Sequence, residues 1–474
     1  MQAPEETPSL PREVVPDELP APLRDDPHPG FLRDVLHGLY GLCWYAAALI
    51  GSPLLLWRSL RRPGFAGMVA DRCGRGLADQ VGKHRSRGRR VLIHGVSVGE
   101  VKGAQPIVRG LEESYPDLDV AVSVTTDTGT ELARKLFPDN LVVRFPVDLA
   151  RVVRRFLRTV RPDFVVLIEL EIWPNFLREC NRMGIPVVVI NGRITDKSHA
   201  QYHLFRNLLP QFDRISLYCA QAEEYADRFL RLGVDPDRLI VTGNIKADGL
   251  SIGAVDAGEE LTRLLGARDR LCLVAGSTHG PEELFLVRAW KQACPQARLI
   301  LVPRHPNRSA EVVQSIRDEF GFEPQLLSKL REGEAPDPLR PALVDTIGEL
   351  ERVYALADLV FIGGSLIPHG GQNMLEPAAQ GKAVVYGPHV TNFVQEAQLL
   401  EAAGAARRVE GVPELVRSIE ELSGDGAARE TMGAAGRAAA AAQKGASRWT
   451  LLALERLGVG GASRPSRPGG DVHG

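Results

Sequence analysis

Short apolar runs alternate with longer amphipathic segments from residue 90 to about residue 425. Runs such as RVLIH, DVAVSVTT and FVVLIEL are rich in β-branched residues, which is typical of buried strands. The segments between them have the length and apolar periodicity of helices. This alternation predicts β-α-β units and parallel sheets. The other strand candidates are LVVRFP, IPVVVIN, ISLYCAQ, RLIVTGN, RLCLVAG, ARLILVPRH, PALVDT, LADLVFIGG and KAVVYGP.

The alternation lapses once, in the small-residue, acidic stretch ADGLSIGAVDAGEE that begins at residue 247. We therefore predict an α/β protein with two doubly wound domains that face a cleft, over residues 63–248 and 266–425, joined by a linker at 249–265. Ligands of such sheets bind at the carboxyl ends of the strands. Residues 426–474 begin as an Ala-rich helix and continue as a Gly/Pro/Arg-rich tail, for which we expect disorder.

The first 90 residues have a different character. Residues 1–30 carry eight prolines and seven acidic side chains, so we expect this extension to be unfolded. Residues 39–57 contain no charged residue, and residues 31–62 are predicted to be a membrane anchor. Gly51 and Pro53 leave open a spanning helix, an interfacial hairpin or a tilted anchor, and a buried helix is the alternative. Ten Lys or Arg residues within 58–90 favour contact with anionic lipids and a cytoplasmic location for the rest of the chain.

Charge and cysteine content exclude other classes. The formal net charge of −2 gives no indication of nucleic-acid binding. The six cysteines are scattered and lack C-x-x-C spacing, which indicates reduced thiols and not a disulfide framework or a zinc site.

The motif HGVSVGE ends the first predicted strand of the globular part. Gly95 to Gly99 match the G-x-S-x-G pattern of a hydrolase, in which Ser97 would be the nucleophile. The motif lacks an upstream H-G-G-G segment, however, and five-residue motifs recur by chance. Glu100 follows at the start of a predicted helix, where a carboxylate caps the helix or, if partly buried, acts as a general base.

Two more strand ends carry charged side chains. Glu169 and Glu171 follow the apolar strand FVVLI, and strand alternation places them on the same face. Two carboxylates there are costly without partners, which indicates a functional pair. Lys246 ends another strand and is a cation that suits a leaving phosphate or, alternatively, only solvates the linker.

The second half of the chain has the character of an anion-binding domain. VPRHPNR holds Arg304 between prolines, and a guanidinium can bind a phosphate with two hydrogen bonds. Gly348-Glu349 and the segment 373–376 open predicted helices. The segment 373–376 follows a glycine-rich loop whose backbone is expected to face phosphate, with the glutamate on ribose hydroxyls. His305, His369 and His389 lack metal-ligand spacing, so no metal site is predicted.

These stretches together are similar to the 3-deoxy-D-manno-octulosonate (Kdo) transferases of Gram-negative envelopes. The resemblance covers residues from about 35 to 425 in order. It implies the GT-B fold, a hydrophobic N-terminal anchor at the cytoplasmic face of the inner membrane, and inverting transfer of Kdo from CMP-Kdo to a lipid A precursor of the lipid IVA type without a metal. The segments that carry it are HGVSVGEV, SVTTDTGTELA, FPVDL, IELEIWPN, VINGRITDKS, VTGNIKAD, STHGPEE, VPRHPNR, DTIGELERVYALADLVFIGGSL and HGGQNMLEPAAQGKAVVYGPHVTNF.

The resemblance also implies roles for single residues. Glu100 would be the general base, and Glu169 and Lys246 would stabilise the transition state. The alternatives are a GT-B transferase or epimerase that uses another nucleotide sugar, and a membrane-associated serine hydrolase that uses Ser97. The residues implied to hold CMP are Pro303, Arg304, Ile347, Gly348, Glu349, Asn373, Met374, Leu375 and Glu376.

Overall fold

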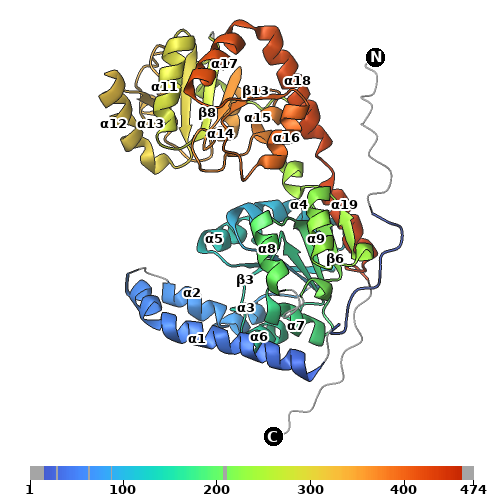
Figure 1. Ribbon diagram of the computed structural model, residues 1–474. Coiled ribbons are helices and arrows are strands. Elements are labelled where there is room, and N and C mark those ends of the chain that lie inside the picture. Colours follow the sequence, from blue (N-terminus) through green and yellow to red (C-terminus); the bar gives the residue numbers. More distant parts are fainter. Residues whose placement is uncertain are drawn as a thin grey trace. The chain divides into compact units, whose positions relative to one another are not determined.

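The computed structural model describes residues 15–27, 30–61, 65–86, 88–205, 211–268 and 270–461. The chain divides into two compact units. Unit 1 comprises residues 1–249 and 444–474, and unit 2 comprises residues 250–443. Each unit is built on one parallel sheet with helices on its faces (Figure 1).

The sheet of unit 1 has the strand order β3-β2-β1-β4-β5-β6-β7 and all its pairings are parallel. The order reverses next to β1, which is the arrangement of a doubly wound fold. The strands are β1 (Arg90–Gly95), β2 (Asp119–Val124), β3 (Leu141–Arg144), β4 (Phe164–Ile168), β5 (Val187–Gly192), β6 (Leu217–Ala220) and β7 (Leu239–Val241).

Both faces of this sheet are buried, which explains why its strands read as continuous apolar runs. In β1, Val91 and Ile93 belong to one core and Leu92 belongs to the other. The helices are α1 (Phe31–Arg61), α2 (Phe65–Arg72), α3 (Leu77–Lys83), α4 (Val98–Ser114), α5 (Asp127–Leu136), α6 (Ala150–Val160), α7 (Pro174–Arg182), α8 (Asp196–Phe205), α9 (Glu223–Arg231) and α19 (Ala446–Arg456), with 3-10 turns η1 (Phe212–Arg214), η2 (Pro236–Arg238) and η3 (Ile245–Gly249).

Unit 2 repeats the plan with the order β10-β11-β9-β8-β12-β13-β14. The strands are β8 (Cys272–Thr278), β9 (Arg298–Pro303), β10 (Gln325–Leu326), β11 (Ala342–Leu343), β12 (Leu359–Ile362), β13 (Ala383–Tyr386) and β14 (Ala406–Arg408). The helices are α10 (Glu259–Leu264), α11 (Glu282–Ala293), α12 (Ser309–Phe320), α13 (Leu327–Arg331), α14 (Leu350–Ala355), α15 (Leu375–Ala379), α16 (Val394–Ala402), α17 (Val412–Gly424) and α18 (Gly426–Ala442), with the 3-10 turn η4 (Pro306–Arg308).

All twelve predicted strand segments form strands, and the prediction of two doubly wound parallel sheets is confirmed. The sequence pattern missed β10 and β14, which are edge strands of two and three residues. Strands this short at an edge carry too few apolar positions to produce a recognisable run.

The ends of the two units differ from the expected boundaries. The predicted linker 249–265 already contains α10, in which Leu261 and Leu264 are buried in unit 2. The region 426–474 forms two helices. The first, α18, contacts α15 of unit 2, whereas α19 returns to unit 1 and contacts α4. Residues 462–474 of the expected tail lie outside the described residues.

The acidic, proline-rich extension is more ordered than its composition indicates. Val15 is buried in a core of unit 1, and the Leu23 amide donates to the Ser216 hydroxyl at 3.0 Å. Asp17 and Asp26 form ion pairs with Arg456 and Arg214. The expectation of an unfolded segment over residues 1–30 is therefore corrected for residues 15–27, because these contacts offset the lack of secondary structure. Residues 1–14, 28 and 29 lie outside the described residues.

The predicted anchor is one continuous helix, α1, which passes through Gly51 and Pro53 without a break. The interfacial hairpin is therefore wrong. Among the described residues, α1 is the helix whose length and composition would allow it to cross a membrane, over Asp34–Ser52. Its first turns contact α7 of the same unit, where Asp34 pairs with Arg178. Large apolar side chains farther along α1 are exposed, including Leu49 and Ile50.

Candidate active site

Glu100 lies in the first turn of α4, directly after the carboxyl end of β1. Ser97 is the N-cap of this helix, and its hydroxyl donates to Glu100 Oε1 at 2.7 Å. The Val96 amide donates to Glu100 Oε2 at 2.6 Å. Each carboxylate oxygen thus has one fixed donor and keeps capacity to accept a second hydrogen bond. The motif HGVSVGE therefore caps a helix and orients a carboxylate at the same time.

The Glu100 side chain is largely removed from water, with 8% of the residue exposed. Burial raises the pKa of Glu100 above its ordinary value, while the hydrogen bonds from Val96 and Ser97 oppose the rise. The negative charge of Glu169 adds to the rise and Lys246 works against it. Glu100 is therefore a stronger base than an exposed glutamate, as a proton acceptor requires.

Glu169 and Lys246 form an ion pair beside Glu100, with 2.5 Å between Glu169 Oε1 and Lys246 Nζ. Glu169 has a φ of 64°, in the left-handed region that a side-chain-bearing residue adopts at a cost. Strain of this kind persists where the surrounding structure enforces it, often at functional sites. The Lys246 side chain approaches α4 at Gly103, where an added Cβ would lie 3.5 Å from Lys246 Cγ. The structure therefore brings together the three residues expected to be catalytic.

Two residues that the sequence analysis did not single out hold the turn that carries Lys246. Asn191, at the end of β5, has a φ of 53°, and its buried Oδ1 accepts the Ile245 amide at 3.0 Å. Asp248 accepts the amides of Gly445 and Ser447 at the start of α19. The position of Asn191 at a strand end, in VVVING, was the available signal. The role of Asp248 depends on a helix about 200 residues away, which no local pattern reveals.

The structure corrects the reason given for pairing Glu169 with Glu171. Strand β4 ends at Ile168, so both glutamates lie beyond the ladder and strand alternation does not orient them. Glu171 Oε2 instead accepts the Trp173 indole N–H at 2.8 Å. Burial, with the nearby charges of Glu100 and Glu169, raises the pKa of Glu171 to about 7. Three carboxyl groups therefore influence one another around the end of β4.

In unit 2, Pro303 ends β9 and Arg304 follows it at the carboxyl edge of the sheet. The Arg304 amide donates to the Thr278 carbonyl at 3.0 Å, which ties this loop to the end of β8. The Arg304 side chain is exposed. It stands where a ligand at the strand ends would meet it.

The glycine-rich loop after β12 differs from the expectation that its backbone faces phosphate. The amides of Gly364, Ser365 and Leu366 all donate to the carboxylate of Glu282, at 2.6 to 3.0 Å. The His279 amide donates to the same carboxylate at 3.0 Å. Glu282 is fully buried and takes the place that an anion would have, so these amides are not free to bind phosphate.

The segment 347–349 lies at the start of α14. Ile347 is 89% exposed, and Gly348 has a φ of 91° that favours glycine. Glu349 is held by Arg331 and Arg352, with 2.6 Å and 3.4 Å between the paired atoms. The segment therefore presents one apolar side chain and one fixed carboxylate at the surface of unit 2.

The segment 373–376 forms the start of α15. Asn373 Oδ1 accepts the Leu375 amide at 3.1 Å, and its Nδ2 donates to Glu376 Oε1 at 3.0 Å. Met374 and Leu375 are buried, so their side chains belong to the core. Contact of these two with a ligand would therefore be through the backbone, whereas Asn373 and Glu376 offer polar side-chain atoms.

Comparison with known proteins identifies the family. Residues 69–249 match the family model described as 3-Deoxy-D-manno-octulosonic-acid transferase (kdotransferase). The chain is 32% identical to the 3-deoxy-D-manno-octulosonic acid transferase of Haemophilus influenzae, over 83% of this chain and 90% of that protein. It is also 32% identical to the protein of that name from Bordetella pertussis, over 89% of this chain and 97% of that protein.

The chain belongs to the Kdo transferase family.

The fold agrees with this assignment. Anabaena Alr3699/HepE in complex with UDP is 17% identical, covers 78% of this chain and 100% of its own, and has a TM-score of 0.54. A putative UDP-N-acetylglucosamine 2-epimerase from Listeria monocytogenes is 13% identical, with coverages of 73% and 91% and a TM-score of 0.53. This member of the Kdo transferase family thus has two parallel α/β domains of the GT-B type.

Family membership also decides between the interpretations of HGVSVGE. In this Kdo transferase the Ser97 hydroxyl is engaged with Glu100 as the helix N-cap. Helix N-capping is the common structural role of a serine at this position. The serine hydrolase alternative is therefore set aside, and the chain is a glycosyltransferase.

Proposed function

We propose that this protein transfers Kdo from CMP-Kdo to a lipid A precursor of the lipid IVA type, in lipopolysaccharide biosynthesis. Family membership supports the class of reaction. The observation that carries the mechanism is Glu100, a buried carboxylate held at a helix N-terminus beside the Glu169–Lys246 ion pair. The choice of CMP-Kdo as the donor and of a lipid A precursor as the acceptor rests on the sequence resemblance and is part of the proposal.

Glu100 acts as the general base. It takes the proton of an acceptor hydroxyl while that oxygen forms a bond to the anomeric carbon of Kdo. The bond from this carbon to the phosphate oxygen breaks on the opposite face, and CMP leaves with the electron pair. The anomeric centre is therefore inverted. The raised pKa of Glu100 favours proton uptake, and a positioned base accelerates such a step by about 10²- to 10⁴-fold.

Lys246 and Glu169 supply electrostatic stabilisation. The Lys246 ammonium is close enough to Glu100 to lower its pKa, and in this proposal it stabilises the negative charge that develops in the transition state. Glu169 orients Lys246 through their ion pair, and the surrounding structure holds the backbone of Glu169 in its left-handed conformation. Fixed charges are effective because they do not reorganise during the reaction.

CMP is held by unit 2 in this proposal. Arg304 binds phosphate, the segment 347–349 receives the nucleoside, and Asn373 and Glu376 bind hydroxyl groups. The buried members of the set, Pro303, Met374 and Leu375, contribute backbone and shape. A guanidinium and helix N-termini take the phosphate charge, so the proposed reaction needs no metal.

The acceptor is reached at the cytoplasmic face of the inner membrane. Helix α1 is attached to unit 1 by Asp34 and by Tyr40, whose hydroxyl donates to Asp148 at 3.0 Å. Its exposed apolar side chains suit the acyl region of a bilayer, so we favour a helix that lies in the interface. Arg75, Lys83 and Arg85 are exposed and available to headgroups, whereas Arg90 is buried and paired with Asp119.

The test is incubation of the full chain in detergent with CMP-Kdo and a lipid A precursor, with the lipid product measured by mass spectrometry. A mass increase by whole Kdo residues supports the proposal. Stabilisation of the protein by UDP but not by CMP in a thermal-shift assay would point to another nucleotide sugar. Covalent labelling of Ser97 by a fluorophosphonate would instead support the serine hydrolase alternative.

A further inference from the structure

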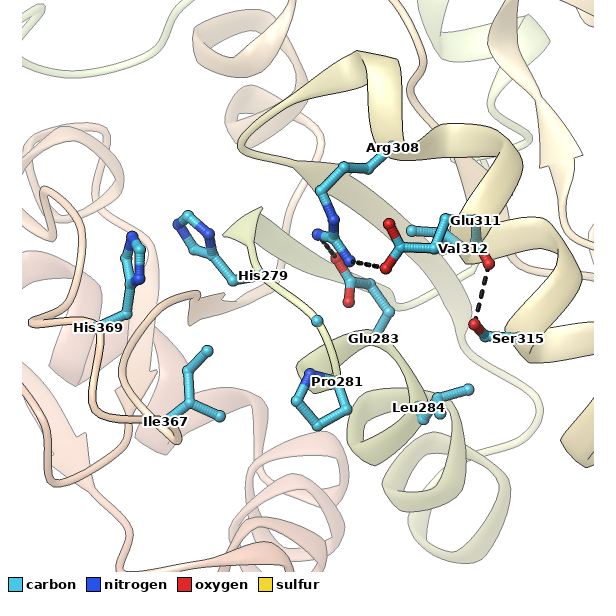
Figure 2. A pocket seen from close by; sticks show the side chains of 11 residues that line it. His279, Pro281, Glu283, Leu284, Arg308, Glu311, Val312, Ser315, Ile367 and His369 are labelled. Carbon is cyan, nitrogen blue, oxygen red and sulfur yellow. Dashed lines mark hydrogen bonds and ion pairs between the residues drawn. The ribbon is translucent and has the colours of Figure 1, made fainter. Parts of the chain in front are cut away.

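Unit 2 contains a cavity of about 500 Å³ that none of the residues assigned so far lines. Its walls come from the loop after β8, from α11, from η4 and α12, and from the loop after β12 (Figure 2). In this sheet β8 lies between β9 and β12, so the strand order reverses at β8. The cavity therefore lies at the topological switch point, where doubly wound sheets bind ligands, and its volume is in the range of small-molecule sites.

The cavity is continuous with the residues proposed to hold CMP. His279 lines it, and the preceding residue, Thr278, accepts the Arg304 amide. On the other side, His279 Nε2 lies 3.3 Å from Gln372 Nε2, next to Asn373. A ligand bound by Arg304 and Asn373 would therefore have the cavity beside it.

The walls are fixed before any ligand arrives. Glu282 ties the β8 loop to the β12 loop through four backbone amides. Arg308 is bound to Glu283 and Glu311, at 3.1 Å and 3.0 Å (Figure 2). A preorganised site loses little entropy on binding.

The lining favours hydroxyl groups over a second anion. Two glutamates face one arginine, so the charged lining side chains sum to −1. Burial and the neighbouring histidines and arginines lower the pKa of His279 to about 4, so its imidazole is neutral. The neutral imidazole of His279 and the carboxylates can bind hydroxyls, and the apolar surface of Pro281, Leu284 and Ile367 suits the C–H groups between them.

We propose that this cavity binds the hydroxylated carbon chain of the sugar that the donor carries, with His279 and His369 at its mouth. The two rings are tilted by 36° to one another, with their centroids 3.8 Å apart. This inference rests on the proposed function, since it takes a CMP-linked polyhydroxy sugar as the donor. The cavity is then the part of the protein that distinguishes the donor from free CMP.

The test compares calorimetric binding of CMP and of CMP-Kdo by the full chain. Ser315→Trp fills the cavity from α12, and Gln314→Trp places the same side chain on the exposed neighbouring position, which does not line it. We expect Ser315→Trp to weaken CMP-Kdo binding at least tenfold and to leave CMP binding within twofold. Gln314→Trp is expected to bind both like the parent. His369→Ala, at an exposed side chain, is expected to weaken CMP-Kdo alone by about threefold or more, and serves if Ser315→Trp fails to fold.

Each other outcome has a distinct meaning. If the variants bind CMP-Kdo like the parent, the inference is overturned while the proposed function stands. An equal loss for CMP and CMP-Kdo in the cavity variants would make the cavity a nucleotide site and overturn the inference as well. A parent protein that binds neither CMP nor CMP-Kdo would overturn the proposed donor, and this inference with it.

Discussion

The carboxyl edges of the two sheets are equipped in opposite ways. In unit 1, each carboxylate is held by a neighbouring side chain: Glu100 by the Ser97 hydroxyl, and Glu169 by the Lys246 ammonium. In unit 2, Arg304 and Ile347 are exposed and stand ready for a partner. Proton transfer needs a carboxylate whose pKa is set in advance, and binding needs surface that a ligand covers. In the proposed function the edges differ because the base is held by the protein itself, whereas the exposed groups of unit 2 that would bind phosphate and nucleoside gain their partner only when the donor binds.

The largest expected effect is at Glu100. Glu100→Gln keeps the size of the side chain but removes the base, so we expect transfer to fall by about 10²- to 10⁴-fold. Turnover of CMP-Kdo measures the loss, and calorimetry should find CMP binding unchanged. Ser97→Ala is the matched control. Loss of the helix cap should lower its free energy of unfolding by about 1 kcal/mol, while most of the transfer activity is retained. A Ser97→Ala variant that is as inactive as Glu100→Gln would contradict this division of roles.

Lys246→Met breaks the ion pair that sets the charge around the base. The change removes a cation that lowers the pKa of Glu100 and leaves Glu169 unpaired, so the pKa of Glu100 rises further. The base is active when deprotonated and activity is lost as pH falls through its pKa. The acidic limb of the pH-rate profile should therefore move to higher pH, with a drop in maximal rate of about 10²-fold. A variant with the parent's pH profile would show that Lys246 does not act on Glu100.

Arg304→Ala tests the open edge of unit 2. Loss of a charge-assisted hydrogen bond to phosphate costs about 1.5 to 3 kcal/mol, so the Kd for CMP should rise by about 10- to 150-fold. The rate at saturating donor should fall as well, because Arg304 is also proposed to take the phosphate charge that develops as CMP leaves. Arg288→Ala is the control, since Arg288 is a surface arginine of the same unit paired with Glu319. Equal effects of the two substitutions would remove Arg304 from the donor site.

The smallest expected effect concerns backbone strain at Glu169. Glu169→Gly and Glu169→Ala both remove the carboxylate, but only glycine adopts a φ of 64° without cost. We expect the free energy of unfolding of the glycine variant to be about 1 kcal/mol larger than that of the alanine variant. Both variants should lose the same amount of activity. Chemical denaturation of the pair measures this difference. Equal stability would mean that the local backbone relaxes in the alanine variant.

The sequence by itself determined the fold class, and it also pointed to the candidate site residues. Apolar strands buried on both faces and helical segments between them are local patterns, so twelve strands and two doubly wound sheets followed from them. The rule that parallel strands end at one edge, with the resemblance, selected Glu100, Glu169 and Lys246. Composition failed for residues 15–27, because their order depends on partners such as Ser216 and Arg456 that lie far along the chain.

Only the tertiary structure decided how these groups act. The proximity of Lys246 to Glu169, 77 residues apart, and the support of its turn by Asp248 and α19 are long-range contacts. The glycine-rich loop after β12 looked like a phosphate site, yet its first amides, including those of Gly364 and Ser365, donate to Glu282, a residue more than 80 positions earlier. Burial, and with it the raised pKa of Glu100, exists only once the core has formed. Residue type and local pattern can be read from the sequence, but the desolvation and pairing of the charged side chains arise from packing.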